Sequence, residues 1–260
     1  MDQDVPQIRS LHRGLDVLDF LTEHGPSSLH QLHVGTGLSK SALRRILATL
    51  RERRAIRVGI SDGMYRSNIA TLRAVAPEDS VRMGRLVEAA RPYMLELTER
   101  IKWPSDLHMY LNGRMRILES THGTSPFGLP GNSVVEVDLN IFAAASGLAF
   151  LSGLGEATVR AIYEELKSDV GSSPERYALT VEQLLTELKA VRRDGYAKRR
   201  ISQLGHDNQN AIAVMITEKK RPIGALSISW HRGVMSADDF SRTHLPAFKR
   251  CAEMISRALQ

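Results

Sequence analysis

The sequence has little cysteine, few aromatic residues and no long apolar run. Cys251 is the single cysteine among 260 residues, which excludes an internal disulfide and a cysteine-based zinc site. No segment approaches the roughly 18 apolar residues of a membrane span. The N-terminal "MDQDVPQIRS" carries acids where a secretory signal has a basic region. We therefore expect a cytoplasmic protein with no membrane partner.

Motifs that mark common enzyme classes are missing as well. The sequence contains no phosphate-binding GxxxxGK[ST] loop, no GxSxG nucleophile elbow and no His–Glu pair at the spacing of a zinc protease. Cys251 keeps helical spacing with Phe248, Ile255 and Leu259, which predicts a buried thiol in a terminal helix rather than a nucleophile. We expect no catalytic residues, no cofactor and no metal site.

Positive charge is concentrated in one segment. The formal net charge is +6, and residues 38–58 alone hold seven basic residues against one acid, Glu52. Lys and Arg side chains that neutralise phosphates release condensed counterions, so such a segment favours a polyanionic partner. A solvated basic face is the alternative explanation, and composition alone does not decide between the two.

The first 75 residues have the helix order of a DNA-binding module. An amphipathic helix is predicted over residues 8–25 from an apolar stripe of Leu11, Leu15, Leu18 and Leu21. A second short helix follows Ser28, with inward-facing positions expected at Leu29, Leu32 and Val34. After a turn at Gly37, Ser39 supplies an N-cap oxygen for a third helix.

The third helix carries the candidate DNA contacts. Its leucines share one side at about 100° per residue and its charged residues lie roughly opposite, so one face packs on a core while the other meets a groove. Five residues near its start suit phosphates or guanine edges: Ser39, Lys40, Ser41, Arg44 and Arg45. Two short strands joined by an Asp62-Gly63 turn follow, and Arg57 and Arg66 are expected to hold the DNA backbone there. Together these elements predict a winged helix-turn-helix domain over residues 1–78.

A helical linker and a second domain are expected to follow. Residues 79–91 predict a connecting helix suited to a homodimer contact, and a separate helix should begin at Pro92 because proline breaks a helix interior. In residues 92–260, two apolar runs flank Asn112-Gly113, a strong hairpin signal. Further strands are expected over 195–203, 210–217 and 222–230, with helices near 156–167, 181–194 and from Ser236 onward. This order predicts an α+β fold with an antiparallel sheet.

Along nearly its whole length the sequence resembles the IclR family of bacterial transcription regulators. The resemblance rests on the order of several segments, "RGLDVLDFL", "GLSKSALRRILATL", "AARPYMLEL", "AAASGLAFL", "LKAVRRDGYA" and "AIAVMITEKKRPIGALSIS". "WPSDL", "ASGLAFL" and "HLPAFKR" resemble more closely the branch that regulates catabolism of aromatic acids such as hydroxyphenylpropionates. The resemblance implies an N-terminal winged helix-turn-helix and a C-terminal GAF-like effector-binding domain, in dimers that can pair into tetramers.

The resemblance also implies effector positions in the second domain. Ser227 and Ser229, whose hydroxyls share one side of a strand, match the family's effector-contacting strand. Ala145 and Gly147 fall in the segment that lines the family's pocket. Solvent exposure of the serines, and close packing of the small residues, are the structural alternatives.

Several positions depart from the family pattern. The family commonly has glycine where Arg54 stands, acids where Arg199 and Arg200 stand, and a cysteine near Asn210. Basic residues in place of acids favour an anionic ligand. We expect its carboxylate to meet Ser227 and Ser229 together with Arg199, Arg200 or His122, and its ring to pack on Phe127, Leu129 and Leu148. Asn210 is a further candidate effector contact.

We therefore expect a dimeric or tetrameric transcription factor controlled by a small organic acid. Its other partners would be double-stranded DNA, at a palindromic or pseudo-palindromic operator, and RNA polymerase as a further candidate. Two-fold related recognition helices would contact half-sites about ten base pairs, or a multiple, apart. Two alternatives remain, a ligand-independent DNA-binding protein and an enzyme acting on aromatic acids.

Overall fold

The computed structural model describes residues 8–68, 77–128, 135–169, 172–200 and 209–260. The chain divides into two compact units, Met1–Arg85 and Leu86–Gln260. The division falls inside one long helix, α4 (Pro77–Ile101), so this helix contributes residues to both units.

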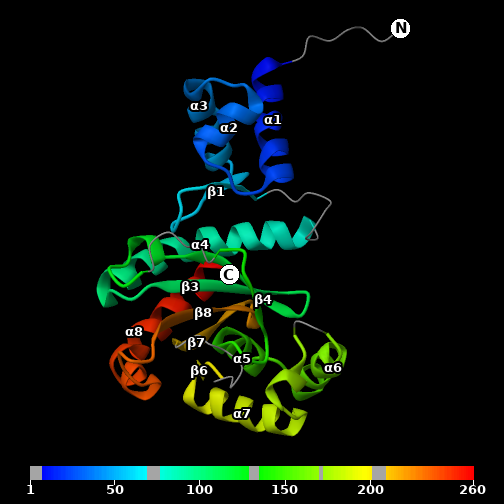
Figure 1. Ribbon diagram of the computed structural model, residues 1–260, viewed down its shortest axis with the longest axis vertical. Coiled ribbons are helices and arrows are strands. Elements are labelled where there is room, and N and C mark those ends of the chain that lie inside the picture. Colours follow the sequence, from blue (N-terminus) through cyan, green and yellow to red (C-terminus); the bar gives the residue numbers. More distant parts are fainter. Residues whose placement is uncertain (1–7, 69–76, 129–134, 170–171, 201–208) are drawn as a thin grey trace. The chain divides into compact units, whose positions relative to one another are not determined.

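The N-terminal unit contains three helices and a hairpin (Figure 1): α1 (Arg9–His24), α2 (Leu29–Thr36), α3 (Lys40–Glu52), β1 (Ile56–Val58) and β2 (Tyr65–Ser67). Both predicted helix caps are confirmed. The Ser28 side chain accepts from the backbone N–H of Gln31, whose side chain in turn accepts from the backbone of Ser28. Ser39 accepts from the backbone N–H of Ala42 at 3.3 Å, which fixes the start of α3.

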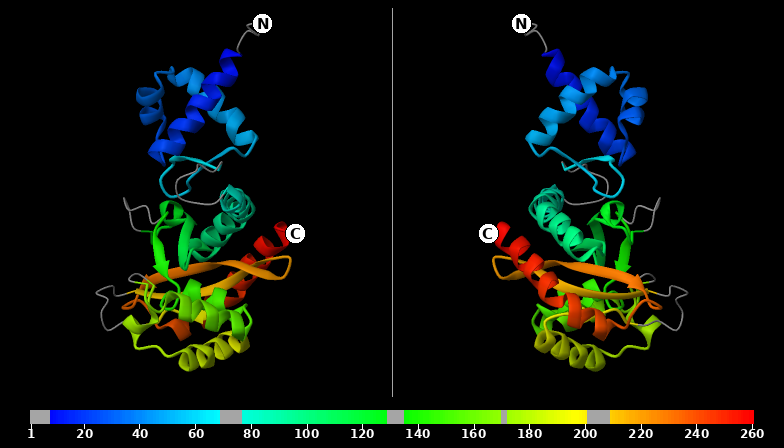
Figure 2. Two further views of the ribbon diagram at one scale, coloured as in Figure 1. Left: turned by 90° about the vertical axis from the view of Figure 1, so that its right-hand side faces the viewer. Right: turned by 90° about the vertical axis from the view of Figure 1, so that its left-hand side faces the viewer.

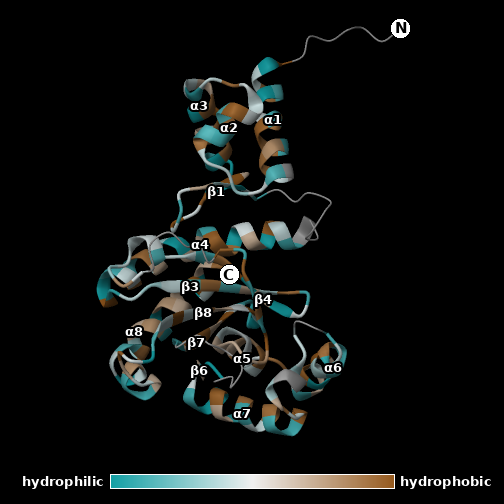
Figure 3. Cartoon of the chain, viewed as in Figure 1, coloured by the Kyte–Doolittle hydropathy of each residue, from teal (hydrophilic) through white to brown (hydrophobic). Residues whose placement is uncertain are grey.

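The core of this unit is small, and it corrects the predicted apolar stripe of α1. Its buried members are Val17, Leu21, Leu32, Leu43, Leu47 and Ile56. Leu11 and Leu15 are instead 59% and 50% exposed, and Val34 of α2 is 69% exposed. The core reaches only the C-terminal half of α1, where Val17 and Leu21 lie. The stripe of buried residues predicted from helical spacing is therefore longer than the stripe that is buried. Figure 3 shows the mixed hydropathy along this helix.

The predicted hairpin after α3 is confirmed. Strands β1 and β2 pair antiparallel with Arg57 opposite Arg66, and Gly63 in the connecting turn has a φ of 66°. Arg54, just after α3, has a φ of 56°, which lies in the left-handed region. Glycine adopts that region without steric cost, which is why glycine suits this position.

The predicted helix break at Pro92 is wrong, because α4 runs through it. An interior proline removes one backbone hydrogen bond. Here the apolar face continues across it: Leu86, Val87, Ala90, Met94 and Leu97 are all at most 4% exposed. Burial of that face on both sides of Pro92 offsets the lost hydrogen bond and keeps one helix.

The C-terminal unit is built on a six-stranded antiparallel sheet in the order β5-β4-β3-β8-β7-β6. The strands are β3 (Ser105–Leu111), β4 (Arg114–Ser120), β5 (Asp138–Asn140), β6 (Ala197–Lys198), β7 (Gln209–Glu218) and β8 (Arg221–His231). The hairpin at Asn112-Gly113 is confirmed, and both residues have positive φ, 47° and 79°. Of the strand expected over 195–203, Ala197 and Lys198 pair with β7, and residues 201–203 lie outside the described residues.

Helices cover both faces of this sheet (Figures 1 and 2). On one face lie α5 (Ala145–Ser152), α6 (Glu156–Leu166) and α7 (Val181–Asp194), and on the other lie the second half of α4 and α8 (Ala237–Ala258). Short 3-10 turns occur at η1 (His122–Thr124) and η2 (Pro174–Tyr177). The predicted α+β class with an N-terminal helix-turn-helix is thus confirmed.

Cys251 is buried in α8, as predicted. Its thiol donates to the backbone carbonyl of Tyr93 at 3.4 Å. Burial raises the pKa of this thiol to about 12, so the reactive thiolate is suppressed at neutral pH. The side chain contributes to packing between α8 and α4.

Gly147 provides a test of the packing around α5. A Cβ atom there would lie 2.0 Å from the backbone oxygen of Ile141, which cannot rotate away. We expect Gly147→Ala to lower the free energy of unfolding of the C-terminal unit by about 1 to 3 kcal/mol. Urea unfolding followed by tryptophan fluorescence isolates this unit, because Trp103 and Trp230, the two tryptophans, both belong to it. Gly155→Ala is the control, since nothing lies within 4 Å of its Cβ position, and an equal loss in both variants would contradict the assignment.

Candidate functional site

The first candidate site is the exposed face of α3. Leu43 and Leu47 point into the core, with 0% and 2% exposure. Five of the seven residues predicted to contact DNA are exposed on or before its first turns: Ser39, Lys40, Ser41, Arg44 and Arg45. The core-facing leucines therefore fix which side of α3 presents its three cationic side chains to solvent.

Arg57 and Arg66 lie elsewhere than predicted. Both are only 4% exposed. Arg57 Nη1 donates to Asn68 Oδ1 at 2.8 Å, and Asn68 Nδ2 donates to the backbone oxygen of Arg54 at 3.0 Å. Arg66 donates to both carboxylate oxygens of Asp62, at 3.0 and 2.7 Å. These guanidinium groups hold the hairpin together, because a short hairpin cannot bury them without such acceptors.

The second candidate site is a cavity of about 390 Å³ in the C-terminal unit. The cavity lies between the sheet and the first turn of α5. Its volume suits a small organic molecule. Six of the residues predicted to contact an effector line it: His122, Ala145, Arg199, Arg200, Ser227 and Ser229. The fold therefore brings together residues that are more than 100 positions apart in the sequence.

Four other predicted effector residues do not line this cavity. Leu148 is fully buried in the core, and Gly147 packs against the backbone of Ile141. Phe127 is 55% exposed and stacks on Trp103 with ring centroids 4.6 Å apart. Asn210 donates to the backbone oxygen of Met235 at 3.2 Å. Leu129 lies outside the described residues.

Several cavity residues were not anticipated. They are Asp106 and His108 on β3, Asn140 at the end of β5, Ser146 in α5 and Tyr177 in η2. In "SDLHMYL" the polar residues Asp106 and His108 recur at a spacing of two within an otherwise apolar strand. That period indicates that both lie on one face of the sheet, and it was the available sequence signal.

The sheet side of the cavity holds buried ionisable groups. His108 Nε2 lies 2.7 Å from Ser227 Oγ, and burial lowers the pKa of His108 to about 3, so the ring is neutral at pH 7. Asp106 Oδ1 lies 3.8 Å from His122 Nε2. Burial raises the pKa of Asp106, while the charge of His122 and a hydrogen bond from Ser120 oppose that shift.

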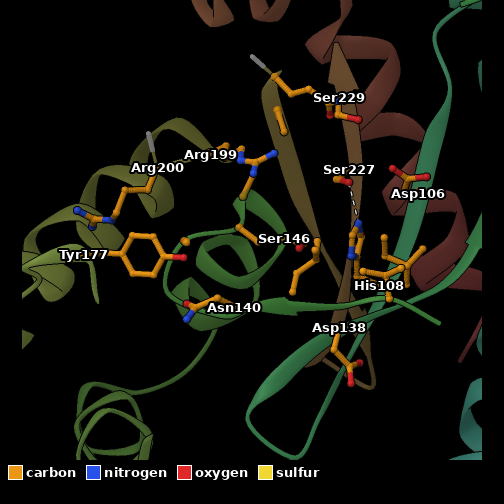
Figure 4. A pocket seen from close by; sticks show the side chains of 18 of the residues that line it. Asp106, His108, Asp138, Asn140, Ser146, Tyr177, Arg199, Arg200, Ser227 and Ser229 are labelled. Atoms are coloured by element: carbon orange, nitrogen blue, oxygen red, sulfur yellow. Dashed lines mark hydrogen bonds between the residues drawn. The ribbon is translucent and has the colours of Figure 1, made fainter. Parts of the chain in front are cut away.

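The opposite side carries basic residues. Figure 4 shows Arg199 and Tyr177 directed toward the cavity, facing Ser227 and His108 across it. Backbone hydrogen bonds hold this edge in place, from Arg199 N–H to Ala211 at 2.8 Å and from Arg200 N–H to Ala143 at 3.0 Å. The Arg200 side chain turns to Glu187, with which it forms an ion pair. Arg199 is thus the guanidinium directed into the cavity.

Two kinds of feature are absent from the described part of the chain. It contains no group of three or more His, Cys, Asp or Glu side chains arranged to hold a metal ion. None of its helices has the length and apolar character needed to cross a membrane.

Comparisons with known proteins agree with both units. Residues 10–58 match the IclR helix-turn-helix domain, and residues 79–257 match the C-terminal domain of the bacterial transcriptional regulator IclR. A transcriptional regulator from Rhodococcus sp. RHA1 is similar at a TM-score of 0.57 and 20% identity, over 97% of this chain and 98% of that one. An IclR family transcriptional regulator from Brucella abortus gives 0.56 and 19%, over 100% and 95%.

A third similar structure contains a ligand. It is an IclR homolog from Microbacterium hydrocarbonoxydans complexed with 4-hydroxybenzoate, with a TM-score of 0.54 and 20% identity over 96% of this chain and 98% of that one. At these identities the three structures show a shared fold. Because the two domain matches cover most of the sequence in the order observed here, the chain belongs to the IclR family of bacterial transcriptional regulators.

Proposed function

We propose that this IclR-family regulator binds a palindromic or pseudo-palindromic operator through α3, and that an aromatic organic acid in the C-terminal cavity controls that binding. The observation that carries the proposal is a cavity of about 390 Å³ with a guanidinium, Arg199, at one edge and the start of a helix beside it. Such a site recognises a small organic anion.

The DNA contacts are assigned to the exposed start of α3. Lys40, Arg44 and Arg45 supply cationic groups to phosphates or guanine edges, and Ser39 and Ser41 supply hydroxyls. Arg57 and Arg66 act indirectly, since their hydrogen bonds set the shape of the hairpin beside α3.

The effector carboxylate is assigned to Arg199, Ser229 and the first turn of α5. Backbone N–H groups in the first turn of a helix have no partner within the helix, and they favour anions. Ser146 stands in that turn and lines the cavity. Apolar residues complete the lining for a ring: Ile117, Val137, Leu139, Ala143, Ala144, Ala145 and Ala211. The 4-hydroxybenzoate complex of the similar Microbacterium protein supports an aromatic acid.

Control of DNA binding requires that the effector prefer one arrangement of two recognition helices. We assign residues 1–78 to DNA binding, 79–91 to a linker and 92–260 to effector binding, in a homodimer or tetramer. The linker lies within α4, which contributes residues to both compact units. A change at the effector domain can therefore reach the DNA-binding domain through one helix.

Removal of the Arg45 side chain tests the DNA assignment. We expect Arg45→Ala to weaken operator binding by about 1 to 3 kcal/mol, the range for one good base contact. Lys189→Ala is the control, because Lys189 is exposed on α7 and its loss changes the net charge equally. Fluorescence anisotropy with a labelled operator fragment at fixed salt measures both. Equal affinities of Arg45→Ala and wild type would remove Arg45 from the site.

Removal of the Arg199 charge tests the effector assignment. A thermal-shift screen of the full chain against benzoates, phenylacetates, phenylpropionates and short aliphatic acids first selects a binding acid. We then expect Arg199→Gln to weaken the binding of that acid by about 1.5 to 3 kcal/mol, as measured by calorimetry, because a charge-assisted hydrogen bond is lost. Arg193→Gln is the control, since Arg193 is exposed and pairs with Asp194. If no acid shifts the melting temperature while DNA still binds, the ligand-independent alternative is favoured.

A further inference from the structure

Three buried polar side chains at the cavity each have one atom without a hydrogen-bond partner among the described residues. They are Asp106 Oδ1, His108 Nδ1 and Ser146 Oγ. Asp106 is 6% exposed, and His108 and Ser146 are 1% exposed. Nearly all buried polar groups in folded proteins are paired, and an unpaired one costs free energy. Three such atoms around one cavity indicate that polar groups of a ligand form the missing hydrogen bonds.

The polar groups on the β3 side of the cavity differ from the guanidinium of Arg199 on the opposite side. Asp106 lies directly opposite Ser227 in the pairing of β3 with β8, so these residues and His108 form one patch on the sheet. Ser227 already pairs with His108, and the contact of Asp106 to His122 at 3.8 Å is longer than a hydrogen bond. This patch therefore needs a further partner. Figure 4 shows it facing Arg199 across the cavity.

A hydroxyl group fits this patch better than a second carboxylate. A hydroxyl both donates and accepts, so it can pair with the Asp106 carboxylate and with either tautomer of neutral His108. A second carboxylate beside Asp106 brings two acidic groups together, which is unfavourable at pH 8 because they either both carry a negative charge or must hold a proton between them. An ammonium group pairs with Asp106 but has no acceptor for a protonated His108 Nδ1.

We infer that Asp106 and His108 form a selectivity subsite that binds a hydroxyl group of the effector and excludes a second carboxylate. The inference rests on the proposed function, because it takes the opposite end of the effector to be the carboxylate at Arg199 and Ser229. It adds the orientation of the ligand and names the residues that discriminate between acids. Asp106 keeps its buried position despite the cost to folding because ligand recognition requires it.

Matched acids test the subsite with the full chain. Calorimetry at pH 8 compares benzoate with 4-hydroxybenzoate, 3-phenylpropanoate with its 4-hydroxy derivative, and pentanoate with 5-hydroxypentanoate. We expect the hydroxylated member of the pair that fits the cavity to bind about 10- to 100-fold more tightly, because its hydroxyl pairs with a buried oxygen that otherwise has no hydrogen bond. Terephthalate, with a carboxylate at each end, should bind more weakly than 4-hydroxybenzoate.

The Asp106→Asn variant separates recognition from structure. The amide of Asn can donate to a carboxylate, so we expect terephthalate to bind the variant at least about tenfold more tightly than it binds the wild type. The preference for hydroxylated over unsubstituted acids should shrink. The empty variant should be at least as stable as the wild type, because a neutral amide replaces a buried ionisable carboxyl. Asp138→Asn is the matched control, since Asp138 also lines the cavity but pairs with Arg116 at 2.8 Å.

The possible results distinguish a failure of the hydroxyl subsite from a failure of the proposed acid-binding function. Equal binding of hydroxylated and unsubstituted acids overturns the subsite and leaves the acid-binding function intact. Tighter binding of 4-(aminomethyl)benzoate than of 4-hydroxybenzoate overturns the hydroxyl assignment and indicates an effector with an ammonium group opposite its carboxylate. If none of the acids binds, the proposed function itself fails.

Discussion

The alternation of side chains along β3 is the constraint on which the C-terminal unit depends. Leu107, Met109 and Leu111 are buried on one face, so the pleat places Asp106 and His108 on the other. The register of β3 with β8 then puts Ser227 opposite Asp106. A shift of one residue would move the polar side chains into the apolar layer beneath α4 and α8, where they would have no cavity to face.

The cavity exists because small side chains meet where larger ones would fill the space. Alanines at the start of α5 and Ala211 on β7 line it, and Ala225 lies opposite His108 in the pairing of β8 with β3. Protein interiors are close-packed, so a volume that holds a small molecule requires such a gap in side-chain size. The polar atoms left around the gap then determine which ligand can occupy it.

The N-terminal unit divides its basic residues between two roles. Amphipathic packing of α3 leaves Lys40, Arg44 and Arg45 in solvent, where phosphate attraction acts over several ångströms. Arg57 and Arg66 are buried and hydrogen-bonded, so their charges organise the hairpin. A local charge excess in the sequence therefore overstates how much of that charge reaches a partner.

The sequence determined the features that depend on neighbouring residues. Helix caps at Ser28 and Ser39, the turn at Asn112-Gly113 and the amphipathic sides of α3 follow from local hydrogen bonding and periodicity. Tertiary packing decided the rest. Burial of its apolar face carried α4 through Pro92, and the small N-terminal core left Leu11 and Leu15 exposed because it does not extend to them. Hydrogen bonds to Asn68 and Asp62 held Arg57 and Arg66 inside the hairpin. The pairing of Asp106 and His108 with Ser227 likewise depended on strand register, which joins positions more than 100 residues apart and which no local pattern specifies.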